Sequence, residues 1–278
     1  TCVRVLPTAG AFSLAAARIG WSLDDPMLAC VSVHALPFEA LTPHISPLAK
    51  LLILSRSGTT PSQIAAMLTE RGYGDSRLSV LERMGGSAEG RRDGRAADEW
   101  PVGFDNLSVV AVLCVAGADA IRQSRAPGLA DDDYLHDGTI TKRDIRAVTL
   151  SALAPLPGEM LWDVGAGNGS IAIEWLRLCP SAHATAIERD PARAARISEN
   201  AKRLGVPGVT VIEGVAPASF GGLPAPDAIF IGGGLAETPE LLKISMTRLK
   251  QGGRIVANAV TLEAEAELLS ARARIGGE

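Results

Sequence analysis

A glycine-rich run near the middle of the chain is the strongest candidate for chemistry. It reads Trp162-Asp163-Val164-Gly165-Ala166-Gly167-Asn168-Gly169-Ser170. The run closes a predicted strand and opens a predicted helix, so its backbone N–H groups can face a ligand, and glycine lets that ligand come close. Gly165 and Gly167 match the start of a dinucleotide-binding fingerprint, but the next glycine follows after two positions instead of three. This spacing favours another adenosine cofactor over NAD.

Glu188 is the second candidate, because it ends the next predicted strand, 23 residues after Gly165. A carboxylate at this place can accept hydrogen bonds from both ribose hydroxyls. Its alternative role is to cap the helix that starts at Pro191, but Asp190 performs that role more naturally. We therefore expect Glu188 to hold a sugar and Asp190 to cap the helix.

Small residues follow the third and fourth strands of the same region. Ala216 lies where an adenine would pass, and a small side chain there leaves room for a flat ring. Three glycines at 232–234 suggest a backbone that lies close to a large, flat acceptor.

The elements that must position these residues alternate regularly. Strands are predicted at 160–164, 184–188, 209–213, 228–231 and 254–259, and helices at 170–178, 191–204, 239–249 and 263–273. Such alternation implies parallel strands joined by right-handed crossovers, hence a doubly wound α/β sheet. Ligands bind at the carboxyl ends of the strands in such sheets.

The first part of the chain also mixes strands and helices. Strands are predicted at 29–33, 51–54, 78–81 and 109–115. A helix is predicted over 61–71, with Thr60 and Gln63 as a capping box and Pro61 as the first helical residue. Residues 85–101 are polar and glycine-rich and should form an exposed loop, and residues 125–137 should form a linker.

Length and composition limit the classes of protein. A chain of 278 residues predicts two domains, and 47% apolar residues predict a folded, water-soluble protein. Few aromatic residues and a net charge of −4 argue against a nucleic-acid partner. The longest apolar stretch, 109–118, is shorter than the roughly 18 residues of a membrane span. Four widely spaced cysteines predict buried free thiols, no metal site and a cytoplasmic location.

Together these motifs resemble the class I S-adenosylmethionine methyltransferases. Asp137-Gly138-Thr139-Ile140-Thr141-Lys142-Arg143-Asp144-Ile145-Arg146, the Thr-Lys segment, is similar to the pattern hydrophobic-Thr-Lys-x-acid-aliphatic-Arg of the precorrin C15 methyltransferases of cobalamin biosynthesis. Methyltransferases of exocyclic amines often carry Asn/Asp-Pro-Pro-aromatic after the fourth strand, where this chain has the three glycines. That difference argues against amine methylation.

The resemblance implies S-adenosyl-L-methionine as the cofactor and no metal. It places Thr141 beside the cofactor, the glycine run at its methionine part, Glu188 at the ribose and Ala216 at the adenine. The implied cofactor-binding residues are Thr141, Gly165, Ala166, Gly167, Asn168, Gly169, Glu188 and Ala216. No residue emerges as a necessary general base, so the catalytic residues stay unassigned.

Residues 6–21, 31–34 and 57–61 resemble the second half of a tetrapyrrole methylase domain of the precorrin C5 type. We therefore expect the C-terminal part of such a domain at 1–124, a linker at 125–137, and at 138–278 a class I, Rossmann-like methyltransferase domain truncated at its C-terminus. The implied function is C-methylation of a precorrin, at C15 with decarboxylation of an acetate side chain and at C5 in an intact first domain. The expected partner is a tetrapyrrole substrate, with association into a homo-oligomer and neither nucleic acid nor membrane.

Three other functions remain open at this point: a methyltransferase with another small-molecule or macromolecular acceptor, an NAD-dependent oxidoreductase, and a binding module without catalysis. The glycine spacing disfavours the oxidoreductase.

Arg143 and Arg146 stand one helical turn apart and are candidates to pair with substrate carboxylates.

Overall fold

The computed structural model describes residue 3 and residues 7–238 and 240–277. The chain divides into two compact units, Thr1–Gln123 and Ser124–Glu278. Residues 125–137, where we expected a linker, belong to the second unit.

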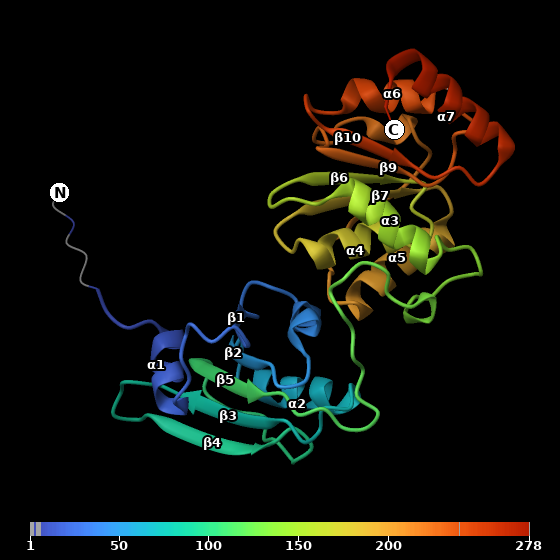
Figure 1. The fold of residues 1–278 in the computed structure, drawn as a ribbon. Coiled ribbons are helices and arrows are strands. Elements are labelled where there is room, and N and C mark those ends of the chain that lie inside the picture. Colours follow the sequence, from blue (N-terminus) through green and yellow to red (C-terminus); the bar gives the residue numbers. More distant parts are fainter. Residues whose placement is uncertain (1–2, 4–6, 239, 278) are drawn as a thin grey trace. The chain divides into compact units, whose positions relative to one another are not determined.

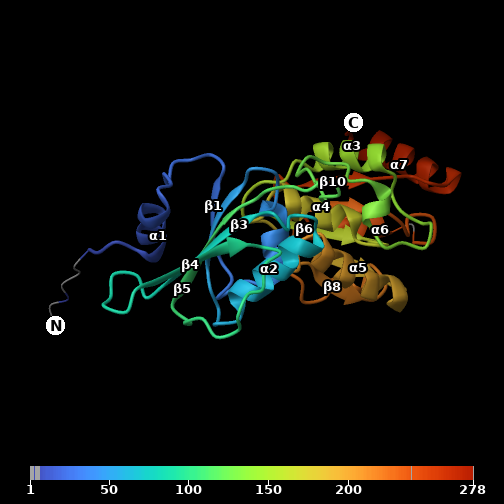
Figure 2. The same ribbon diagram turned by 90° about the horizontal axis from the view of Figure 1, so that it is seen from below.

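The first unit contains a five-stranded sheet in the order β1-β2-β5-β3-β4. Its strands are β1 (Leu28–Ser32), β2 (Lys50–Leu54), β3 (Arg77–Glu82), β4 (Gly90–Arg95) and β5 (Ser108–Leu113). Only β1 and β2 pair in parallel. Two helices, α1 (Ala11–Ile19) and α2 (Thr60–Glu70), cover opposite faces of the sheet (Figure 2), and each packs on its own group of apolar side chains.

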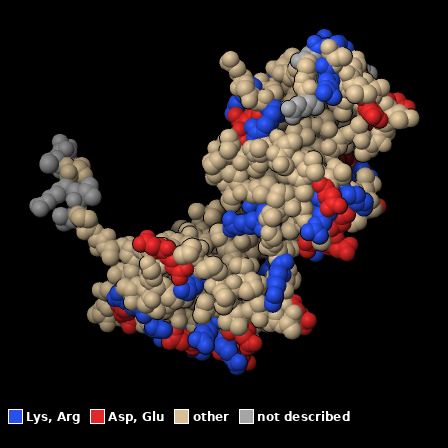
Figure 3. All heavy atoms as spheres, viewed as in Figure 1, with Lys and Arg blue, Asp and Glu red and all other residues tan. Residues whose placement is uncertain are grey.

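Strand β4 corrects our prediction of a loop over residues 85–101. It forms the edge of the sheet, and its exposed side chains are Arg91, Arg92, Asp93 and Arg95. Figure 3 shows basic and acidic side chains along the lower border of the first unit, where Figure 1 places β4. An edge strand with charged side chains discourages pairing with other chains, but it lacks the apolar alternation by which strands are recognised.

Helix α2 lies where the sequence predicts it, but the capping box does not form. The Thr60 hydroxyl accepts hydrogen bonds from the backbone N–H groups of Arg56 (3.1 Å) and Ser57 (3.2 Å), which precede the helix. Thr60 therefore holds the turn that leads into the helix.

The second unit is the predicted doubly wound sheet, in the order β10-β9-β6-β7-β8 with every pairing parallel. Its strands are β6 (Met160–Val164), β7 (His183–Glu188), β8 (Thr210–Glu213), β9 (Ala228–Ile231) and β10 (Arg254–Ala257). Its helices are α3 (Arg143–Leu153), α4 (Ser170–Leu178), α5 (Pro191–Arg203), α6 (Leu241–Arg248) and α7 (Leu262–Ile275). Residue 239, the predicted start of the fourth of these helices, lies outside the described residues.

Helices cover both faces of this sheet, so successive residues of a strand enter different cores. Helices α3, α4 and α5 lie on one side of the strands, and α6 and α7 lie on the other (Figure 1). In the central strand β6, Leu161 packs with the first group of helices, and Trp162 and Val164 pack with the second. Strands buried on both faces are typical of parallel sheets.

No helix in the described part of the chain has the length and apolarity to cross a membrane.

Three cysteines lie among the described residues, and all are free thiols. Cys114 and Cys179 are buried, as predicted, but Cys30 is exposed on the edge strand β1.

Candidate functional site

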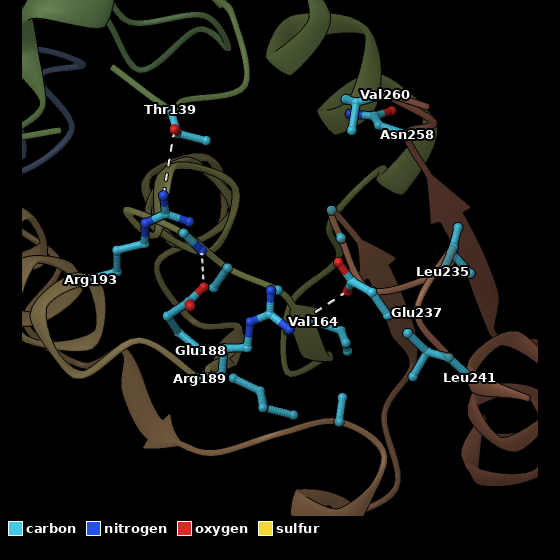
Figure 4. A pocket seen from close by; sticks show the side chains of 18 of the residues that line it. Thr139, Val164, Glu188, Arg189, Arg193, Leu235, Glu237, Leu241, Asn258 and Val260 are labelled. Atoms are coloured by element: carbon cyan, nitrogen blue, oxygen red, sulfur yellow. Dashed lines mark hydrogen bonds and ion pairs between the residues drawn. The ribbon is translucent and has the colours of Figure 1, made fainter. Parts of the chain in front are cut away.

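A cavity of about 310 Å³ lies at the carboxyl ends of the strands in the second unit (Figure 4). The chain runs from β6 outward to β7 and β8 on one side and later to β9 and β10 on the other. The loops after β6 and β9 therefore leave the sheet in different directions and open a crevice between them. Residues at or just after the end of all five strands line the cavity.

The glycine turn after β6 forms the floor of this cavity. The N–H groups of Gly165 and Ala166 donate to the Ile187 carbonyl of β7, over 3.0 and 3.1 Å. Gly167 has a left-handed backbone (φ +58°), and a Cβ added there would meet no atom within 4 Å. The open space above Gly167 lets a ligand approach the backbone closely.

Gly169 has a different role and does not line the cavity. It precedes α4 with φ +78°, and a Cβ added there would come within 2.6 Å of the Ile197 side chain on α5. Glycine at this position allows α4 and α5 to pack closely, so Gly169 supports the turn from behind.

The glycines after β9 contact the glycine turn. A Cβ at Gly165 would approach the Gly233 nitrogen to 3.0 Å, and a Cβ at Gly232 would approach the Gly165 carbonyl to 3.2 Å and the Phe230 ring to 2.8 Å. Of the three glycines that suggested closeness to a flat acceptor, Gly232 is therefore needed for contact between two loops of the protein. Among these three glycines, Gly233 alone has open space at its Cβ position and no left-handed backbone.

Asp190 caps α5, as predicted, and Glu188 lies at the cavity. The Asp190 side chain caps α5 by accepting from the N–H groups of Ala192 (2.8 Å) and Arg193 (3.1 Å). Glu188 lines the cavity and is 5% exposed. Its carboxylate accepts from the N–H groups of Gly167 (2.8 Å) and Asp190 (2.9 Å), so it joins the end of β7 to the glycine turn.

The Thr-Lys segment forms another wall of the cavity through residues 139–141. The Asn168 amide of the glycine run donates to the Thr139 carbonyl over 2.5 Å. The Arg193 guanidinium lies 3.5 Å from the Thr139 hydroxyl (Figure 4). Except for Gly169, the structure gathers every predicted site residue around this cavity: Thr141, Gly165, Ala166, Gly167, Asn168, Glu188 and Ala216.

Our sequence reasoning missed several polar residues of the cavity. Arg189 and Glu237 form an ion pair of 3.7 Å beside it (Figure 4), and Asn258 donates to the Thr149 hydroxyl over 3.1 Å. Arg189 and Asn258 directly follow the ends of β7 and β10. The rule that ligands bind at the carboxyl ends of parallel strands could have identified both.

The prediction that Arg146 pairs with substrate carboxylates was wrong. Its side chain has no exposed surface and lies among carboxylates and carbonyls of the protein. Arg143, one turn earlier on α3, is exposed.

Asp163, beneath the cavity, is a buried carboxyl group without a cationic partner among the described residues. It is fully buried on β6, and burial raises the pKa of its carboxyl to about 7. A hydrogen bond from the Ala172 N–H (3.0 Å) opposes this rise, and the negative charge of Glu188 adds to it. One of the Asp163 oxygens has no hydrogen-bond partner.

Within the described residues, no three His, Cys, Asp or Glu side chains are arranged to hold a metal ion.

The parallel sheet, its strand order and the glycine turn at the crevice define a class I, Rossmann-like methyltransferase fold. A family model described as "Precorrin methyltransferase domain" matches residues 132–278. The chain belongs to this precorrin methyltransferase family.

Similar proteins cover nearly the whole chain. A precorrin-6Y C(5,15)-methyltransferase [decarboxylating] of Sinorhizobium sp is 49% identical over 99% of this chain and 66% of its own length. A protein of the same name from Mycobacterium tuberculosis is 44% identical over 99% of this chain and 68% of its own length. The chain thus spans about two thirds of the length of these relatives.

A solved structure resembles the second part of the chain. The C-terminal domain of precorrin-6Y C5,15-methyltransferase from Rhodobacter capsulatus is 43% identical, with a TM-score of 0.53, over 56% of this chain and 83% of its own.

The raised pKa of Asp163 predicts a pH-dependent stability. Below its folded pKa the native protein keeps a proton that the unfolded chain releases above about pH 4, so the free energy of unfolding falls as the pH rises from about 4 to 7. Urea unfolding should show this fall, on the order of 2 to 3 kcal/mol between pH 5 and 7 at most. Asp163→Asn should remove most of it.

Asp132→Asn, which changes an exposed carboxylate of the same unit, is the control and should leave the difference between the two pH values intact. Equal pH dependence in the wild type and Asp163→Asn would contradict the prediction.

Proposed function

We propose that the second unit binds S-adenosyl-L-methionine in this cavity and transfers its methyl group to C15 of a precorrin, with decarboxylation of an acetate side chain. The observation that carries the proposal is the meeting of the glycine turn, Glu188 and Ala216 around one cavity at the strand-order reversal. The family of the chain and the names of its relatives agree with it.

The residues of the cavity fit this cofactor. A volume of about 310 Å³ is within the range of small-molecule sites. An ionised carboxylate offers about four acceptor positions, and the N–H groups of Gly167 and Asp190 use two of those on Glu188. The others can accept from the two hydroxyls of a ribose.

The protein's contribution to this reaction is mainly positioning. The sulfonium of the cofactor supplies a reactive methyl group without a metal or a covalent enzyme intermediate. The acceptor carbon must lie in line with that methyl group, so the walls have to fix both partners. The glycine turn would hold the methionine part, Ala216 would leave room for the adenine, and Thr141 would border the cofactor from the opposite wall.

We assign the C15 reaction to the second unit because the Thr-Lys segment, which resembles the C15 enzymes, forms part of its cavity. The names of the relatives also include a C5 reaction. We associate that reaction with the domain to which the first unit would belong, because residues 6–21, 31–34 and 57–61 resemble a tetrapyrrole methylase. We place the protein in the cytoplasm, which agrees with its free thiols.

A direct assay tests the acceptor. The chain should convert a precorrin that retains the acetate side chain into a product that has gained a methyl group and lost carbon dioxide, as read by mass spectrometry. S-Adenosylhomocysteine should form in equal amount. Cofactor binding without change in any of a panel of precorrins would favour a methyltransferase with another acceptor.

Glu188→Gln should weaken binding of S-adenosylhomocysteine. The variant loses a charged acceptor for the ribose, which corresponds to about 1.5–3 kcal/mol, or a roughly 10- to 150-fold rise in Kd. Isothermal titration calorimetry measures this change.

Glu213→Gln is the matched control, because Glu213 pairs with Glu188 in the neighbouring strand but is exposed and does not line the cavity. An unchanged affinity in Glu188→Gln would remove Glu188 from the proposed site.

Gly167→Ala tests close approach to the backbone. The new methyl group would stand in the open space of the cavity and displace the ligand, so binding of S-adenosylhomocysteine should be lost or greatly weakened. The left-handed backbone also costs the variant about 1–2 kcal/mol of stability.

Gly252→Ala controls for that cost, since Gly252 has φ +79° and open space but lies outside the cavity. Thermal unfolding should shift similarly in both variants, and only Gly167→Ala should lose binding. Normal binding by Gly167→Ala would show that the ligand does not lie on the glycine turn.

A further inference from the structure

Arg146 is a buried cation near the cavity that the proposed function does not use. It lies on α3 without exposed surface, and its guanidinium bonds two carboxylates. The Nε group donates to Glu174 over 2.8 Å, and one terminal nitrogen donates to Asp131 over 2.6 Å. The ring of Tyr134 covers the guanidinium, 5.0 Å from its carbon.

Glu174, on α4, holds the chain that leads to the cavity wall. It is 2% exposed and accepts from the N–H groups of Gly128 (2.6 Å) and Leu129 (3.2 Å) and from the Tyr134 hydroxyl (2.9 Å). One buried carboxylate therefore binds three groups of the stretch 128–134, which we call the strap.

The Arg146 guanidinium also donates to two backbone carbonyls, one in the strap and one in the cavity wall. One terminal nitrogen also donates to the Thr141 carbonyl over 2.5 Å, and the other donates to the Leu129 carbonyl. Thr141 lines the cavity. The guanidinium thus connects the beginning of the strap, α4 and the cavity wall.

The strap and the wall have little regular structure of their own. Between Ser124 and Lys142 the structure contains one short 3-10 helix, Asp131–Asp133. Their backbone must therefore be held by side chains, and Asn168 and Arg146 hold the carbonyls of Thr139 and Thr141. The wall is fixed at both ends.

Stability alone does not explain this arrangement. Replacing a buried ion pair by well-packed apolar residues is often neutral or favourable for folding. Apolar side chains cannot fix two carbonyls and two carboxylates at set positions, whereas the planar fork of arginine can. Lysine offers a point charge that cannot reach all four groups together.

We propose that Arg146 is a positioning residue, which sets the distance of wall 139–141 from the glycine turn and thereby shapes the cavity for the cofactor. The inference rests on the proposed S-adenosylmethionine site. It concerns a residue that touches neither the cofactor nor the acceptor.

Arg146→Lys is the main test, with Arg177→Lys as the matched control. Arg177 is also a buried arginine (2% exposed), and it donates to the carbonyls of Leu204 and Ser124, away from the cavity. In folded protein, Arg146→Lys should raise the Kd for S-adenosylhomocysteine about tenfold or more. The Kd of Arg177→Lys should stay within about twofold of the wild-type value.

A second measurement needs no ligand. Lys142 is exposed directly after the wall, so trypsin can cut behind it once the segment moves. Arg146→Lys should speed the appearance of the fragment ending at Lys142, identified by mass spectrometry, and Arg177→Lys should not. If Arg146→Lys fails to fold, the double variant Arg146→Met with Glu174→Gln replaces it, because it removes both partners of the buried ion pair. This variant should also bind S-adenosylhomocysteine more weakly and release the fragment ending at Lys142 faster.

The outcomes separate the two proposals. If the wild type does not bind S-adenosylhomocysteine, the proposed function fails, and the trypsin measurement still decides whether Arg146 holds the wall. If the wild type binds, two results would overturn the positioning role alone. One is an equal affinity and an equal rate of trypsin cleavage in Arg146→Lys and Arg177→Lys. The other is a loss of stability in Arg146→Lys with unchanged affinity.

Discussion

The turn that leaves β6 depends on its hydrogen bonds to the neighbouring strand β7. The N–H groups of Gly165 and Ala166 donate to the Ile187 carbonyl, and that of Gly167 donates to the Glu188 carboxylate. These bonds extend the parallel pairing of β6 and β7 past the ends of the strands and keep the turn open toward the cavity. The Glu188 carboxylate is also part of the cavity surface. Its hydrogen bond from Gly167 therefore supports the turn and holds the carboxylate at the cavity.

Close backbone contact explains most of the glycines around this turn. Gly165 and Gly232 allow the loops after β6 and β9 to touch, and Gly169 allows α4 to pack on α5. Only Gly167 combines a left-handed backbone with open space in the cavity, which makes it the glycine most directly suited to ligand approach. Three glycines in one short run therefore meet three different steric requirements, and residue type alone does not distinguish them.

Arg146 and Asp163 are both fully buried near the cavity, and they differ in how their charge is compensated. Arg146 has two carboxylates and two carbonyls around it, so its charge is satisfied and can order the adjacent chain. Asp163 has one N–H donor and a negative neighbour, so the neutral form is favoured, and burial raises its pKa. The first group gives the wall a defined position, and the second makes the free energy of unfolding depend on pH.

The alternation of apolar strands and helices was enough to predict the doubly wound sheet and the carboxyl-end location of the site, because both follow from local periodicity and the handedness of the crossovers. The strand β4 could not be predicted, since an edge strand owes its extended form to hydrogen bonds from β3 rather than to its own polar sequence. Tertiary structure also decided that Arg146 is buried, that Gly169 packs against α5, and that residues 125–137 join the second unit. In each of these cases the deciding contacts are made with another element of the fold, and only folding brings the two surfaces together.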